Sequence, residues 1–189
     1  MKRLSAVVFV VLGLVAVGCA GDDVLVSVGD TDVTREEAAT VLDSQILQLT
    51  TAEQLTQLLP EQAQQVVQND DANLLVFYGY VMNALADAGG AVEEEDRLNA
   101  AALLEGSANG GDVELVAAQL ALAYQVTGLP RPAGEPAERA AAVNAVAQNQ
   151  LGPAIQQSIA AQAQVDVTVD PSLGEWNPQL QLLLPAALS

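Results

Sequence analysis

The sequence predicts a mostly α-helical domain, a multi-helix body closed by a small two-stranded β ribbon from the two ends of the mature chain. Between residues 34 and 163, apolar side chains recur at spacings of three and four, the pattern of helices with one buried face. A valine-rich segment, 24–28, precedes these helices, and a strictly alternating segment, 165–169, follows them. Because a lone strand is unstable, we expect the two segments to pair and to pack on the helices.

The chain begins with a leader that is typical of exported proteins. Met1-Lys2-Arg3 is basic, and an apolar run over 4–17 follows and ends in small residues. This layout is typical of a secretory signal. The run is shorter than the ~20 apolar residues that a permanent membrane helix requires.

Cys19 is the only cysteine of the chain, and it directly follows this leader. Ala16-Val17-Gly18-Cys19 resembles a bacterial lipobox, with Ala16 where leucine is usual; this resemblance implies cleavage before Cys19 and a lipid on its thiol. An ordinary signal peptide with a chance cysteine is the alternative. We therefore expect a body anchored by lipid to the outer, extracytoplasmic face of the cell membrane.

These observations divide the chain into four parts. We expect a signal peptide over 1–18, a lipidated tether over 19–23, a helical domain over 24–178 and an apolar tail over 179–189. One domain of this length buries enough apolar surface to fold without disulfides or metals.

The composition excludes several classes of function. The net charge is −18, and Lys2 and Arg3 lie in the leader, so the remaining chain is still more acidic. Nucleic acid is therefore not an expected partner, because it requires cationic contacts. The chain has no histidine, which excludes Ser-His-Asp catalysis and histidine-containing zinc sites. Without a phosphate-binding glycine loop either, we expect no cofactor. Acid/base catalysis by carboxylates alone is the enzymatic alternative, but the sequence places no pair of acids in a pocket, so we expect no enzymatic activity. The acidity is compatible with basic ligands, and it also favours solubility.

The first predicted elements follow from capping and turn residues. Gly29-Asp30-Thr31-Asp32 predicts a turn after the first strand. Thr34 and Glu37 form the pair of a capping box, which predicts that a helix begins here. The apolar positions of that helix are Ala38, Val41, Leu42, Ile46 and Leu49.

The middle of the chain predicts the centre of the core. A second short helix is expected over 51–59, and Pro60 suits the first turn of the next. Residues 62–69 are mostly polar, so we expect Asp70 or Asp71 to cap a separate, strongly apolar helix over 72–88. Gly89-Gly90 ends it.

The second half continues with helices and closes with a strand. A helix begins at the acidic run 93–96, where the EF-hand spacing of a calcium site is absent. A helix is expected over 112–127, then a proline-rich linker, then an alanine-rich helix over 138–163 with a break or kink at Gly152-Pro153. The tail over 179–189 is apolar without a reliable period.

Three segments resemble the SurA N-terminal type of chaperone domain, within the wider class of trigger-factor-like and PrsA-like folding factors. They are Val24 to Glu37 (VLVSVGDTDVTREE), Leu74 to Asp96, and Val165 to Pro178 (VDVTVDPSLGEWNP). The likeness covers both ends and the middle of the mature chain, and the region from Gly106 to Ala163 contributes nothing distinctive. It implies that the first and last strands pair and close a helical domain.

The resemblance also implies a function. Such domains bind unfolded or extended polypeptides, and full-length members carry a parvulin-type prolyl isomerase domain that this chain has neither the length nor the histidines to contain. We therefore expect a chaperone-like module without isomerase activity; a non-enzymatic scaffold or accessory lipoprotein that docks a specific cell-envelope partner is the alternative. The candidate client-binding residues are Phe77, Tyr78, Tyr80, Met82 and Trp176, with Leu180 and Leu182 to Leu184 in the tail. Core packing is the favoured alternative for the first four, because apolar stripes usually face the interior. Trp176 is likewise better suited to fill the space between ribbon and helices than to serve as a ligand platform.

Overall fold

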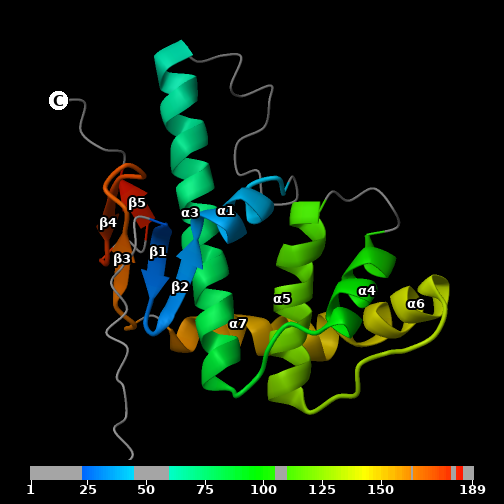
Figure 1. Ribbon diagram of the computed structural model, residues 1–189. Helices are drawn as coiled ribbons and strands as arrows, with labels where there is room; N and C mark the ends of the chain where they lie inside the picture. Colours follow the sequence, from blue (N-terminus) through cyan, green and yellow to red (C-terminus); the bar gives the residue numbers. More distant parts are fainter. Residues whose placement is uncertain (1–22, 45–59, 105–109, 163, 180–181, 185–189) are drawn as a thin grey trace, which may run out of the picture.

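Helices make up most of the chain, and two small antiparallel sheets lie on one side of them (Figure 1). The structure is a computed structural model that describes residues 23–44, 60–104, 110–162, 164–179 and 182–184. The predicted mostly α-helical class with a small β component is therefore confirmed. The leader, Cys19, Ile46, Leu49, Leu180 and the expected helix over 51–59 lie outside the described residues.

The ribbon that closes the domain has three strands in place of the expected two. β1 (Val24–Val28) lies between β2 (Thr31–Thr34) and β3 (Val167–Val169), and both pairings are antiparallel. The turn at Gly29, whose φ is 57°, returns the chain directly, so residues expected to belong to the turn form β2 instead.

The expected pairing of the first and last strands is observed, and it involves fewer residues than the two valine-rich segments contain. Val26 lies opposite Val169, and Val28 lies opposite Val167. Val24 pairs instead with Thr34 on β2, and Val165 lies before β3 begins. Val26 and Val28 are fully buried, so this face of the sheet packs against the helices.

The capping box predicted for the first helix is present. α1 (Arg35–Val41) begins after Thr34, whose hydroxyl accepts a hydrogen bond from the Glu37 backbone N–H at 3.3 Å. In return, the Thr34 backbone N–H donates to Glu37 Oε2 at 2.8 Å. Both bonds satisfy N–H groups that a helix start otherwise leaves unpaired.

The central helix is longer than the sequence suggests. α3 (Pro60–Asp87) runs without interruption through Asp70 and Asp71, so the expectation that either residue caps a separate helix is wrong. No proline or glycine follows Pro60 before Gly79, and a polar stretch without a helix breaker can continue a helix when its neighbours are helical. Gly89, with φ of 71°, follows its end as expected.

Close contact between α3 and the sheet depends on Gly79. A Cβ atom at this position would lie 2.7 Å from Val28 Cγ2 and 3.5 Å from Val33 Cγ2. The absence of a side chain therefore lets the helix approach β1 and β2. Leucines from α3 and α5 complete the core on the other side of this helix, and the fully buried ones are Leu75, Leu85, Leu115 and Leu122.

Most of the remaining helices lie on the side of α3 that faces away from the strands, and the last of them passes α3 toward the strand side (Figure 1). They are α4 (Glu94–Leu103), α5 (Gly110–Thr127), α6 (Pro136–Val146) and α7 (Gly152–Ala161), which crosses beneath α3 and α5. At the break or kink expected around Gly152-Pro153, the helical chain contains a π-helical turn, η1 (Ala147–Leu151), where the Gly152 N–H donates to the Ala147 carbonyl. Pro153 has no N–H, so it cannot donate the next bond of a regular helix.

Arginines bind the acidic start of α4. Arg131 donates to the fully buried Asp96 at 2.8 Å between Nε and Oδ1, and Arg139 pairs with Glu95 at 2.8 Å. The Arg139 guanidinium also donates to the carbonyl of Pro132. These acids therefore hold the proline-rich linker and α6 against α4, in addition to favouring the helix start.

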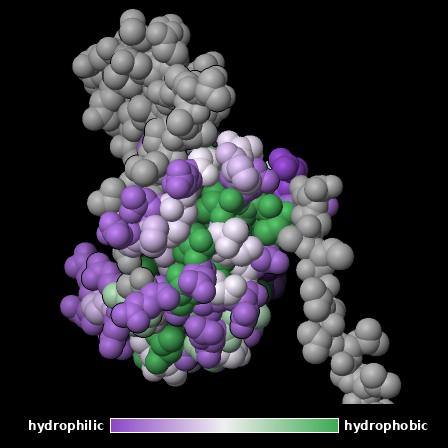
Figure 2. All heavy atoms as spheres, turned by 90° about the vertical axis from the view of Figure 1, so that its left-hand side faces the viewer, coloured by the Kyte–Doolittle hydropathy of each residue, from purple (hydrophilic) through white to green (hydrophobic). Residues whose placement is uncertain are grey.

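A second hairpin covers part of the sheet side. β4 (Glu175–Asn177) pairs with β5 (Leu182–Leu184), and β5 lies within the tail over 179–189, for which the sequence indicated no regular element. Figure 2 shows this side of the molecule, where apolar residues gather in a band surrounded by hydrophilic ones.

Candidate functional site

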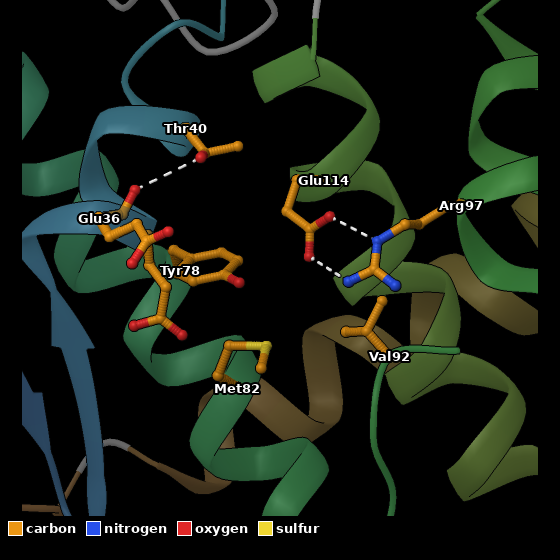
Figure 3. Close-up of a pocket in the computed structure, with 8 residues that line it drawn as sticks. Glu36, Thr40, Tyr78, Met82, Val92, Arg97 and Glu114 are labelled. Carbon is orange, nitrogen blue, oxygen red and sulfur yellow. Dashed lines mark hydrogen bonds and ion pairs between the residues drawn. The ribbon is translucent and has the colours of Figure 1, made fainter. Parts of the chain in front are cut away.

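A cavity of about 400 Å³ opens where α1, α3 and α5 meet the segment leading into α4 (Figure 3). Its wall on the α1 side carries Glu36, Glu37 and Thr40, and its opposite wall carries Arg97 and Glu114. A cavity of this size is at the lower end of the range for small-ligand sites. It suits one long side chain or a molecule of similar size.

The floor of the cavity comes from α3. Tyr78 and Met82 are four residues apart and therefore lie on the same face of the helix. Val92, in the segment that leads into α4, adds a third apolar contact. The floor therefore offers apolar surface beneath acidic walls.

Tyr78 is almost entirely buried, with 3% of its surface exposed, yet its hydroxyl points into the cavity (Figure 3). Among the described residues, no partner forms a hydrogen bond with this hydroxyl. Burial, together with the charges of Glu114 and Glu37, raises the pKa of Tyr78 well above its usual value. The hydroxyl therefore remains a neutral phenol that can accept or donate a hydrogen bond.

Arg97 and Glu114 form a two-pronged ion pair at one wall. The Arg97 Nε lies 2.8 Å from Glu114 Oε2, and its Nη2 lies 3.0 Å from Oε1. The hydrogen bond to Glu114 raises the pKa of Arg97. This parallel geometry fixes both side chains and neutralises one of the acids in the cavity.

The two glutamates of α1 differ in whether their carboxylates already have hydrogen-bond partners. Glu37 is held by the capping box with Thr34. The Glu36 carboxylate forms no hydrogen bond or ion pair within the part of the chain that the structure describes; only its backbone carbonyl is engaged, accepting from Thr40 Oγ1 at 3.4 Å. The cavity thus combines three carboxylates with one guanidinium, and one of those carboxylates is uncommitted.

The chemistry of these groups is that of a binding site for a positively charged or amphipathic group. Neither a histidine nor a cysteine lines the cavity. Across the described ranges, no group of three or more carboxylates, histidines or cysteines is arranged to hold a metal ion.

The structure divides the candidate residues between two places. Tyr78 and Met82 line the cavity, whereas Tyr80 points to the sheet side and meets Trp176 of β4, with ring centroids 6.4 Å apart and planes inclined at 58°. Trp176 and Phe77 are half-buried and pack against the main core. Trp176, on β4, therefore packs toward α3 through its contact with Tyr80.

The acidic and basic residues of the cavity were not identified from the sequence. Glu36, Arg97 and Glu114 belong to three different helices, and no local spacing connects them. The one available indication was the scarcity of arginine, because each arginine among so many acids requires a specific partner.

No protein-family model, curated protein or solved structure matches the chain. None of the helices within the described ranges is both long enough and apolar enough to cross a bilayer.

Proposed function

We propose that the protein is a membrane-anchored, extracytoplasmic chaperone-like module that binds unfolded or extended polypeptides without catalysing prolyl isomerisation. The observation that carries the proposal is the cavity between α1, α3 and α5, in which Tyr78 and Met82 lie beneath acidic walls. Grooves between helices that combine apolar and polar groups are a common mode of peptide recognition.

The composition of the floor suits variable ligands. Met82 is half-buried and flexible, so it can adjust to side chains of different shape. Tyr78 presents a fixed polar group at the centre of the same floor. A site with one adaptable apolar contact and one fixed polar contact favours extended segments of different sequence over a single rigid substrate.

The sequence supports the proposed location at the membrane and the proposed lack of isomerase activity. The leader and Cys19 support export and attachment by lipid, since two or more acyl chains hold a protein stably at a membrane. The absence of histidine supports binding without isomerase catalysis. The pairing of β1 with β3 is also the arrangement that the resemblance to SurA-type domains implies.

The test uses the full chain in detergent micelles and a chemically denatured, unrelated soluble protein. We expect the chain to slow the aggregation of this client, measured by light scattering, and to leave prolyl isomerisation of a test peptide unchanged. Uncatalysed isomerisation takes roughly tens to hundreds of seconds, so weak catalysis is detectable.

A pair of variants tests whether the cavity is the surface that protects the client from aggregation. Met82→Gln places a polar amide on the cavity floor and should reduce protection, whereas Val126→Gln changes an exposed side chain on α5 and should not. Equal protection by both variants would remove the cavity from the proposal. Failure to protect any client, combined with one-to-one capture of a single envelope protein, would favour the scaffold alternative.

A further inference from the structure

We propose that the cavity binds the cationic end of an arginine or lysine side chain, so that the protein prefers basic segments of extended polypeptides. This inference rests on the proposed function and specifies the chemistry of its ligand. Its basis is the arrangement of Glu36, Tyr78 and Met82 around one space (Figure 3).

The charges of the cavity favour a cation. Three carboxylates face one guanidinium, and Arg97 is already paired with Glu114 on two atoms. The remaining negative charge is on the α1 wall, where Glu37 is occupied by its cap and Glu36 is not. A ligand cation at this wall would gain a partner without breaking an existing pair.

Tyr78 provides an indication of a ligand that does not depend on the acids. Its side chain is buried, but its hydroxyl faces the cavity and has no hydrogen-bond partner among the described residues. The hydroxyl reaches the open space of the cavity, where a ligand can supply the partner that the described residues do not. A donor N–H of an ammonium or guanidinium group would satisfy the phenol oxygen while its charge faces Glu36.

The apolar floor accounts for the rest of such a side chain. Met82 and Val92 lie beside Tyr78 and provide surface for a chain of methylene groups. Lysine and arginine bury their aliphatic stems in this way while the charged end meets polar groups. An acidic ligand would meet the unpaired carboxylate of Glu36, and a purely apolar one would leave both Glu36 and Tyr78 without partners.

The test measures the binding of labelled, flexible peptides that differ at one central residue, which is arginine, lysine, citrulline or norleucine. Citrulline keeps the length of arginine and removes its charge, and norleucine keeps the four side-chain carbons of lysine without the ammonium group. The full chain is used in detergent micelles, and binding is followed by fluorescence anisotropy. We expect the charged peptides to bind about tenfold more tightly than their neutral counterparts, the effect of one charge-assisted hydrogen bond.

The variants separate the cavity from the general acidity of the protein. Glu36→Gln should abolish the preference for charge, and Tyr78→Phe should reduce it severalfold. Glu175→Gln removes one negative charge from an exposed position on β4 and should leave the preference intact. The preference should persist when salt is raised to a level that screens attraction between distant surface charges.

The outcomes distinguish this inference from the proposed function. If arginine and citrulline peptides bind equally well, or if Glu175→Gln acts like Glu36→Gln, the inference fails and the proposed function stands. If no peptide binds but N-acetyl-arginine amide shifts the nuclear magnetic resonance signals of Tyr78, the cation site stands and polypeptide binding fails. If neither the peptides nor the amide bind, both are wrong.

Discussion

Ser44 donates a hydrogen bond from its hydroxyl to the Asp112 carboxylate, with 2.7 Å between Oγ and Oδ1, although 68 residues separate them in the sequence. Both residues are buried, and they connect the end of α1 to the start of α5. A backbone contact accompanies this bond, because Gly111 lies directly against the Thr40 carbonyl and the Ser44 N–H. The two walls of the cavity, with Glu36 on one helix and Glu114 on the other, are fixed relative to each other by this junction.

Ser44→Ala should lower the free energy of unfolding by about 1–3 kcal/mol, because it removes a donor from a buried carboxylate. Urea denaturation followed by circular dichroism measures the change. The matched control is Ser27→Ala, which removes an exposed hydrogen bond to Asp32 of 2.6 Å and should cost less than ~0.5 kcal/mol. Equal losses in the two variants would contradict the structural role of the junction.

Gly79→Ala should destabilise the protein by about 1–3 kcal/mol, the range for overpacking a core. In an exposed helix the same substitution stabilises by up to ~1 kcal/mol, so the sign of the effect tests the contact between α3 and the sheet. The added methyl group would meet Val28 Cγ2 at 2.7 Å. Gly110→Ala is the control, since a Cβ atom there meets nothing within 4 Å. Thermal unfolding of both variants decides whether the packing is as described.

Local patterns predicted much of the fold, because their causes are local. The capping box at Thr34 and Glu37 and the helix end at Gly89-Gly90 depend on residues within a few positions. The third strand was missed because Thr31 and Asp32 favour turns in isolation, and the neighbouring strand β1 imposes the extended conformation. This is the usual way in which tertiary pairing overrides propensity.

The cavity could be predicted only in part, for a different reason. Tyr78 and Met82 share a helix face, so their spacing alone brings them together. Glu36 and Glu114 approach this face only after α1 and α5 have packed against α3. A contact that depends on the packing of whole helices leaves no periodic pattern in the sequence.

The pairing of the two ends can be tested by a disulfide. In a Cys19→Ala background, Val28→Cys and Val167→Cys should form a cross-link on mild oxidation, because the two residues face each other. The bonds from Gly29 N–H to Asp166 O and from Asp170 N–H to Leu25 O make this a non-hydrogen-bonded pair. Such pairs have Cα atoms about 4.5 Å apart, within the range for disulfides. Non-reducing electrophoresis after proteolysis detects the link.

The control for this cross-link combines Val28→Cys with Thr168→Cys. Thr168 is the next residue along β3 and is exposed, so its side chain points to the opposite face of the sheet. Efficient cross-linking of this second pair would contradict the register.

Cys19→Ala should leave export intact and abolish stable membrane attachment, because the proposed acyl chains provide the binding energy. Fractionation of cells before and after a salt wash measures the attachment. Ser27→Ala, which leaves the leader unchanged, is the control for expression. Retention of the Cys19→Ala protein in the membrane fraction after the wash would show that another element anchors it.

The stability of the protein should fall as the pH rises above 10. Burial is the main cause that raises the pKa of each of the three tyrosines, Tyr78, Tyr80 and Tyr124, above the usual value of 10.0. Below pH 10 the phenols are neutral in both the folded and the unfolded chain, so their contribution is constant. Above it the unfolded chain loses protons while the folded chain retains them, and the free energy of unfolding decreases with pH.

The alkaline range isolates these tyrosines, because the chain has no histidine and Lys2 is its only lysine. Tyr78 has the largest shift, so Tyr78→Phe should raise the pH at which the protein unfolds, and Tyr80→Phe should raise it less. Near-ultraviolet absorbance measures phenolate, and circular dichroism measures unfolding in the same samples. The two transitions should coincide in the wild type. Phenolate that appears in full near pH 10 while the helices remain folded would show that the Tyr78 hydroxyl is freely solvated, which is incompatible with its buried place at the centre of the cavity.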